Sequence, residues 1–175
     1  MLTKLTNLPI QFQLLYRAQL FHPRPHEQGE YHLVKIRQTE PGGYEELKVI
    51  VSVIDENEFP MPNIPVAFSY STAKQVLLSQ DFTWTPPAFR ADVFPTTGSG
   101  QIEHIQGSVI KEGEPGGITV FILDPRYSSA YVSGVGALAN HAGVHLTFQL
   151  QRQGVIPINV RLDRIEDRLK ALGGF

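Results

Sequence analysis

Cysteine is absent from this chain of 175 residues. Its absence excludes a disulfide framework, a thiolate zinc site and a cysteine nucleophile. Charged residues are scarce as well, at 18% of the chain, where about a quarter is usual. The formal net charge of −2 gives no electrostatic reason to bind nucleic acid or an anionic membrane. We therefore expect an uncharged polar surface and no nucleic-acid partner.

Signals for export and membrane insertion are also missing. The first residues do not combine a basic segment, an apolar segment and a cleavage site. No apolar run approaches the ~18 residues that a membrane helix needs. We expect no membrane insertion, and a protein that stays in the cytoplasm or joins an assembly released without a standard secretion signal.

Motifs for catalysis are weak. The chain has no G-x-S-x-G elbow, and its glycine-rich stretch 133–143 lacks the lysine of a phosphate-binding loop. Ser128, His141 and His145 are the parts from which a serine–histidine site could be built. A nucleophile needs a base within hydrogen-bond reach, and nothing in their spacing predicts this. We expect no enzymatic activity, no catalytic residues and no cofactor.

Two histidine pairs raise the question of a metal site. His22 and His26 are four residues apart, as are His141 and His145. That spacing places two ligands on one face of a helix, but prolines and a glycine interrupt these segments. In an extended chain four residues span ~13 Å, which is too far for one ion. The sequence therefore predicts no metal site.

The regular feature around which the chain is organised is a pair of alternating apolar stretches. Residues 47–54 and 64–70 both show the period of two that is typical of strands. The acidic, proline-bearing stretch 55–63 separates them, and we expect Asp55 to brace this turn by accepting backbone amides. The pattern predicts an antiparallel two-stranded unit with one buried face. The residues expected to be buried here and in a later strand are Val49, Val51, Val53, Val66, Phe68, Val120 and Ile122.

Other segments alternate in the same way. We expect strands within residues 10–20, 31–38, 102–110, 145–150 and 155–160, and a continuous apolar strand at 118–123 that is central. Turn residues separate these segments. The pattern predicts an all-β fold, an antiparallel sandwich of about seven to nine strands with an N-terminal strand extension.

The stretch 51–68, V-x-V-x-D-x-x-x-x-P-x-P-N-x-P-V-x-F, resembles the opening of bacterial immunoglobulin-like and transthyretin-like β-sandwich modules. Glu58 (or Asn57) and Asn63 stand where glycines are usual in that family, and Asn tolerates the left-handed backbone that a glycine allows. The turns at 95–101 and 113–120 also resemble the family's pattern. The resemblance covers about residues 47–150 and implies an immunoglobulin-like sandwich. It implies little about function, beyond a loose link to modules beside cell-wall hydrolases.

Aromatic side chains in expected loops are a lead towards a ligand. Trp84, Tyr127 and Tyr131 fall outside the strand alternation, and flat rings with a polar tip bind sugars and proteins. Together with His141 and His145 they form a candidate ligand-binding set. This set supports an alternative function, a glycan- or cell-envelope-binding module, although the same rings could cap the ends of the sandwich.

The C-terminal segment has a different pattern. An amphipathic helix is expected at 162–172, ended by Gly173 and Gly174, so that residues 1–161 form the sandwich domain and 162–175 the helix. Its apolar stripe must be buried by the sandwich or by a partner. We hypothesise a non-catalytic structural protein that forms homo-oligomers or larger assemblies of a surface, virion or filament. The expected assembly contacts are Leu162, Ile165, Leu169 and Leu172.

Overall fold

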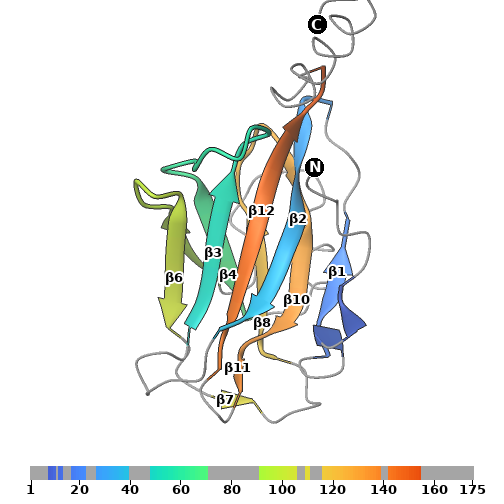
Figure 1. Ribbon diagram of the computed structural model, residues 1–175, viewed down its shortest axis with the longest axis vertical. Helices are drawn as coiled ribbons and strands as arrows, with labels where there is room; N and C mark the ends of the chain where they lie inside the picture. Colours follow the sequence, from blue (N-terminus) through green and yellow to red (C-terminus); the bar gives the residue numbers. More distant parts are fainter. Residues whose placement is uncertain are drawn as a thin grey trace, which may run out of the picture.

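The computed structural model shows a sandwich of two five-stranded sheets (Figure 1). It describes residues 8–10, 12–13, 17–22, 27–39, 48–70, 91–105, 109–110, 116–138 and 142–154. Strands form almost all of the regular structure in these ranges, which confirms the expected all-β class. Within them no helix has the length and apolar character that crossing a bilayer requires.

The strands of the described residues vary from two residues in the shortest to ten in the longest. Their bounds are β1 Gln19–Phe21, β2 Gly29–Gln38, β3 Lys48–Ile54, β4 Pro65–Ser69, β5 Ala91–Pro95, β6 Gln101–Ile105, β7 Val109–Ile110, β8 Ile118–Ile122, β9 Ser128–Ser129, β10 Tyr131–Val135, β11 Ala137–Leu138 and β12 Val144–Arg152. Most of the strands expected from alternation are present. The one expected at 155–160 lies outside the described residues.

The two sheets differ in the direction of their strands. The first sheet, in the order β1-β10-β8-β4-β5, is antiparallel throughout and has β8 at its centre, as predicted. The second sheet, in the order β6-β3-β12-β2-β9, contains two parallel pairs, β3 with β12 and β2 with β9. The expectation of a fully antiparallel sandwich was therefore wrong. Alternation reports which face is buried, not the direction of the neighbouring strand.

The predicted pairing of β3 with β4 was also wrong. β3 lies between β6 and β12 in the second sheet, whereas β4 lies between β8 and β5 in the first. Residues 55–64 thus carry the chain from one sheet to the other. Both strands do bury one face, and the side chains on those faces meet in the same core. The same alternation fits two strands paired in one sheet, as in a hairpin, and two strands in facing sheets, as found here.

The main core fills the space between the sheets. All seven side chains predicted to be buried are at most 3% exposed. On the second sheet, Val49, Val51 and Val53 of β3 are in register with Val144, Leu146 and Phe148 of β12, so the two strands present their apolar faces to the core together.

The first sheet also buries its outer face. Ala67, Phe121 and Tyr131 form a second apolar cluster, and they alternate along their strands with residues of the main core. A strand buried on both faces is mostly apolar, which accounts for the four apolar side chains of Ile118–Ile122. The one polar side chain of this strand, Thr119, is buried as well and donates a hydrogen bond to Ser133.

The N-terminal segment differs from the expectation of a long strand. Residues 10, 12 and 13 are helical, and the backbone amides of Phe12 and Gln13 donate to the carbonyl of Pro9 at 2.9 and 3.3 Å. Proline suits the first turn of a helix because it has no amide hydrogen to satisfy. Phe12 still reaches the core, where it is 1% exposed. The strand β1 begins only at Gln19.

Candidate functional site

At one side of the sandwich, the terminal strands β5 and β6 lie beside exposed apolar side chains. β5 is one of the two terminal strands of the first sheet, β6 is one of the two terminal strands of the second, and the turn at 96–100 joins them. Among the described residues no further strand pairs with the outer side of either. Four large apolar side chains on this surface are between 40% and 64% exposed: Tyr70, Val93, Phe94 and Ile105. We call the surface that they form the β5–β6 edge.

Aromatic contacts hold the two strands of this edge together. His104 of β6 stacks on Phe68 of β4, with ring centroids 4.6 Å apart, and lies 6.0 Å from the ring of Phe94 of β5. Burial lowers the pKa of His104 below its ordinary value, although the nearby Asp92 acts in the opposite direction. The neutral imidazole thus packs as an aromatic ring between the two sheets.

A chain of hydrogen bonds fixes Tyr70 on the same edge. Its hydroxyl donates to Asp92 Oδ2 at 3.1 Å and lies 3.1 Å from His104 Nε2. Because the hydroxyl has one hydrogen, Nε2 of His104 must be the donor in the second bond. The exposed ring of Tyr70 is therefore held in one place. A rigid aromatic side chain is suited to contact a partner, since little entropy is lost on binding.

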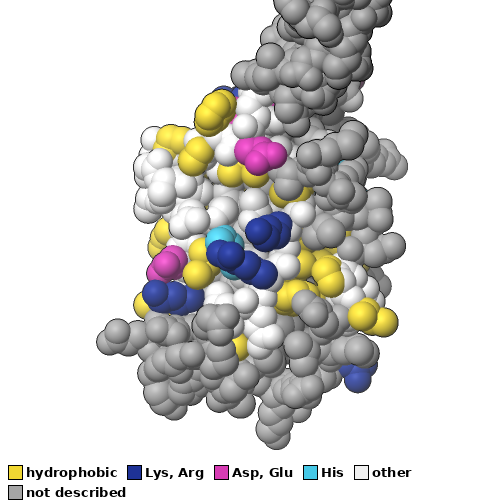
Figure 2. All heavy atoms as spheres, viewed as in Figure 1, with side chains coloured by type: hydrophobic (Ala, Val, Ile, Leu, Met, Phe, Trp, Pro, Cys, Tyr) yellow, Lys and Arg dark blue, Asp and Glu magenta, His cyan; other side chains and the backbone are white. Residues whose placement is uncertain are grey.

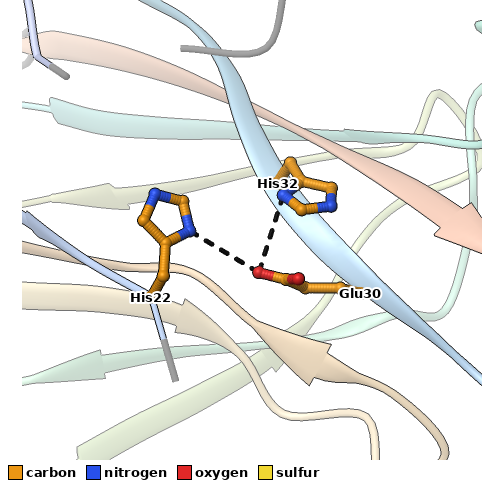
Figure 3. Close-up of side chains that lie close together, drawn as sticks. All are labelled: His22, Glu30 and His32. Atoms are coloured by element: carbon orange, nitrogen blue, oxygen red, sulfur yellow. Dashed lines mark ion pairs between the residues drawn. The ribbon is translucent and has the colours of Figure 1, made fainter. Parts of the chain in front are cut away.

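A second cluster lies at the other side of the sandwich, where the chain passes from β1 to β2 (Figure 3). Nδ1 of His22 and Nδ1 of His32 each lie 3.5 Å from the same oxygen, Glu30 Oε1. Glu30 and His32 are two residues apart in β2, so their side chains lie on the same face of the strand. His22 directly follows β1. One donor atom from each residue lies within 4.8 Å of the others. These residues could hold a metal ion.

Sequence reasoning missed this cluster. The expectation of no metal site rested on the pairs His22 with His26 and His141 with His145. His26 and His141 lie outside the described residues, so those pairs stay untested. The available signal was the spacing of Glu30 and His32, which places both side chains on one face of a strand. Their approach to His22 depends on how the two sheets are stacked.

His145, a predicted ligand-binding residue, lies on the outer face of the second sheet in a network of its own. Nδ1 accepts from Arg37, with Nη2 at 2.8 Å and Nε at 3.2 Å, so Nε2 carries the hydrogen and donates to Ser52 Oγ at 2.7 Å. Burial, then Arg37 and Lys35, lower the pKa of His145. Figure 2 looks onto this face, where basic side chains gather beside a histidine.

Two of the three residues proposed for a serine–histidine site, Ser128 and His145, lie far apart. Ser128 of β9 is in register with Glu30 of β2, whereas His145 is in register with Arg37, seven positions further along the same strand. At ~3.3 Å per residue the two lie roughly 23 Å apart. His141 lies outside the described residues.

Tyr127 was expected in a loop, and it is. The loop after β8 is braced by the buried Asp124, which accepts from Tyr31 at 3.1 Å and from the side chain of Arg126 at 2.8 and 2.9 Å. Burial raises the pKa of Asp124, but these hydrogen bonds outweigh that effect and hold it below its ordinary value. Tyr127 meets Tyr31 edge-on at 5.8 Å and is half-buried against the core.

Tyr131 differs from the expectation. It lies in β10 rather than in a loop, is 4% exposed and stacks on Phe121 at 4.7 Å. Trp84 lies outside the described residues, and the glycan-binding alternative stays a prediction. The stripe Leu162, Ile165, Leu169 and Leu172 lies outside them as well, as does the boundary at residue 162.

In the turn after β3, Glu58 and Asn63 adopt left-handed backbone angles, with φ of 70° and 60°. Left-handed angles of this kind occur in many turns, so they do not test the resemblance to immunoglobulin-like and transthyretin-like modules. The family assignment itself remains a resemblance. Comparison of the chain with protein-family models, with curated proteins and with solved structures found no match.

Proposed function

We propose that this protein is a non-catalytic structural protein that assembles with copies of itself through the β5–β6 edge. The observation that carries the proposal is the coincidence of two sheet-terminal strands with exposed apolar side chains at one side of the sandwich. An edge strand presents unpaired backbone groups to which another chain can add.

The exposed apolar side chains of β5 do not protect it against such pairing. Val93 and Phe94 are exposed in the middle of the strand, and β5 contains no lysine or arginine. Natural edge strands are commonly protected by lysine, proline or inward-pointing charges. Of these devices, β5 has Pro95 at its very end and the charge of Asp92, which is in register with the core residue Phe68 and accepts a hydrogen bond from Tyr70. Val93, at the centre of the strand, is uncharged and exposed, and it is the position open to a partner.

The charges of the edge favour a second copy as this partner. Antiparallel pairing of two β5 strands about Val93 would set Asp92 opposite Phe94, so that the two acids do not face each other. Like charges directly opposite one another would be destabilising. The net charge of −2 is small, so repulsion between whole copies is weak.

Molar mass in solution tests the proposal. Light scattering during size-exclusion chromatography, at tens of micromolar protein, is expected to give a multimer for the unchanged chain. Val93→Lys and Ile105→Lys should each shift the protein towards the monomer, because they place a charge where apolar surface must be buried. Gln19→Lys is the matched control, since it adds the same charge to the opposite terminal strand of the first sheet.

A folded, monodisperse monomer of the unchanged chain under these conditions would refute self-assembly. Assembly that persists unchanged in Val93→Lys and Ile105→Lys would place the contact elsewhere. Both substituted side chains are exposed and contribute little to the core, so each variant should keep its strands. Circular dichroism of each variant checks this.

A further inference from the structure

We propose that His22, Glu30 and His32 form a binding site for a divalent transition-metal cation, with Zn²⁺ as the ion that fits best. The site lies at the β1–β2 side of the sandwich, away from the β5–β6 edge. It is independent of the proposed assembly and goes beyond it.

The separations between the donor atoms carry the argument. Each histidine Nδ1 lies 3.5 Å from Glu30 Oε1. A hydrogen bond from nitrogen to oxygen is normally ~2.7–3.2 Å long, so both separations exceed a well-formed hydrogen bond. Two ligands on a tetrahedral Zn²⁺ with bonds of ~2.0–2.2 Å stand about 3.3–3.6 Å apart. The two separations therefore fit ligands that share one ion.

The donor set narrows the choice of metal. Two imidazoles and one carboxylate suit Zn²⁺ and its transition-metal neighbours. Mg²⁺ and Ca²⁺ prefer shells made of oxygen, so they are expected to bind weakly or not at all. The carboxylate supplies one negative charge, which lowers the cost of placing a divalent cation beside buried groups.

Two of the three side chains are buried and the third is partly exposed, so that the site is held rigidly and an ion can still reach it. The side chains of Glu30 and His32 are only 11% and 6% exposed, whereas that of His22 is 33% exposed. Two ligands are thus fixed by the sheet, and the third lies on the open side, through which an ion can enter. Three protein ligands leave a fourth position for water.

The position in the fold suggests what the ion does. β1 belongs to the first sheet and β2 to the second, so His22 stands at one end of the crossing between sheets and Glu30 and His32 at the other. An ion held by all three would link the two sheets at this point. Binding to the folded state alone stabilises that state, and the thermal unfolding temperature should rise with Zn²⁺.

Competition against a chromogenic chelator tests the site. The 175-residue chain, freed of metal by chelation and dialysis, is titrated with Zn²⁺, and one ion per chain is expected to bind. His22→Ala should weaken binding at least tenfold. It is the preferred variant because its side chain is the most exposed of the three. Glu30→Gln, which keeps the shape of the side chain, should also weaken binding.

Two control variants keep the remaining chemistry intact. His145→Gln removes a buried histidine of the same sheet, and Glu103→Gln removes an exposed carboxylate from β6. Both should bind Zn²⁺ as the unchanged chain does. Substitution with Co²⁺ adds a structural readout, because a protein-bound tetrahedral ion absorbs visible light strongly and should lose that absorption in His22→Ala.

Absence of Zn²⁺ binding up to millimolar concentration would overturn the proposal. So would equal affinity in the unchanged chain and in His22→Ala and Glu30→Gln, provided circular dichroism shows both variants folded. The measurement is repeated in Val93→Lys, which alters only the β5–β6 edge. Retained binding in that monomeric variant would separate the metal site from the assembly.

Discussion

Asp55 shows how one side chain can set the path of the chain between the two sheets. Its Oδ1 accepts from the backbone amides of Asn57 at 2.8 Å and Phe59 at 2.9 Å, which confirms the bracing role expected from the sequence. Its own backbone amide donates to the carbonyl of Phe59 at 2.9 Å. The turn is therefore closed around this residue.

Asp55→Ala should lower the free energy of unfolding by about 0.5–2 kcal/mol, by analogy with the loss of a helix-capping side chain. The two amides would lose their acceptor and have only water in its place. Urea unfolding measures the effect. Asp55→Asn is the control, because its amide oxygen can still accept these bonds. Equal stability of Asp55→Ala and the unchanged chain would contradict the bracing role.

Histidine protonation should make stability depend on pH. In the folded protein burial lowers the pKa of His145, and Arg37 and Lys35 lower it further. Burial also lowers the pKa of His104, and this effect exceeds the opposite effect of the nearby Asp92. The ring of His104 is bonded to the hydroxyl of Tyr70. Below the ordinary histidine pKa of 6.5, the unfolded chain therefore binds more protons than the folded one. The free energy of unfolding should fall as the pH drops from 7.5 through 6.5 to the folded-state pKa.

Urea unfolding at pH 7.5, 6.5 and 5.5 tests this dependence. His145→Gln should remove part of the slope, because Gln does not titrate in this range, while its amide can still bond to Ser52. Glu103→Gln, at an exposed position, should leave the slope unchanged over the same interval. A slope identical in His145→Gln and the unchanged chain would show that His145 does not contribute.

At the scale of elements, the turns that link the two sheets depend on left-handed backbone positions. Gly100, in the turn between β5 and β6, has a φ of 71°. A Cβ there would lie 2.8 Å from the carbonyl oxygen of Val53 and 2.9 Å from the amide nitrogen of Met61. Gly100 thus allows the turn at 96–100 to lie closely against the linker 55–64, because a side chain at this position would collide with it.

Gly100→Ala should destabilise the protein by at least about 1–2 kcal/mol, the cost of a left-handed residue with a side chain. The close approach to Val53 and Met61 adds to this cost. Gly98→Ala is the matched control in the same turn, since its φ is not left-handed and a Cβ there meets nothing within 4 Å. Thermal unfolding compares them, and equal temperatures would contradict this role of Gly100.

At the scale of the whole molecule, the apolar stripe predicted at residues 162–172 bears on assembly. If it contacts another copy, deletion after Arg161 or Leu169→Asp should leave a folded sandwich and abolish higher-order species. Light scattering and circular dichroism measure the two properties together. Unfolding of the truncated chain would assign the helix to its own core, and unchanged assembly would exclude it as the contact. Comparison with Val93→Lys separates this stripe from the β5–β6 edge.

The sequence alone determined the all-β class, the position of most strands, the seven buried side chains and the role of Asp55. Each depends on neighbours along the chain, because a period of two fixes the buried face and a short polar side chain reaches only nearby amides. Only the tertiary structure decided which strands pair and in which direction, and which side chains meet across the sheets. His22 joins Glu30 and His32 because β1 and β2 belong to different sheets that face each other, and no local pattern encodes that contact.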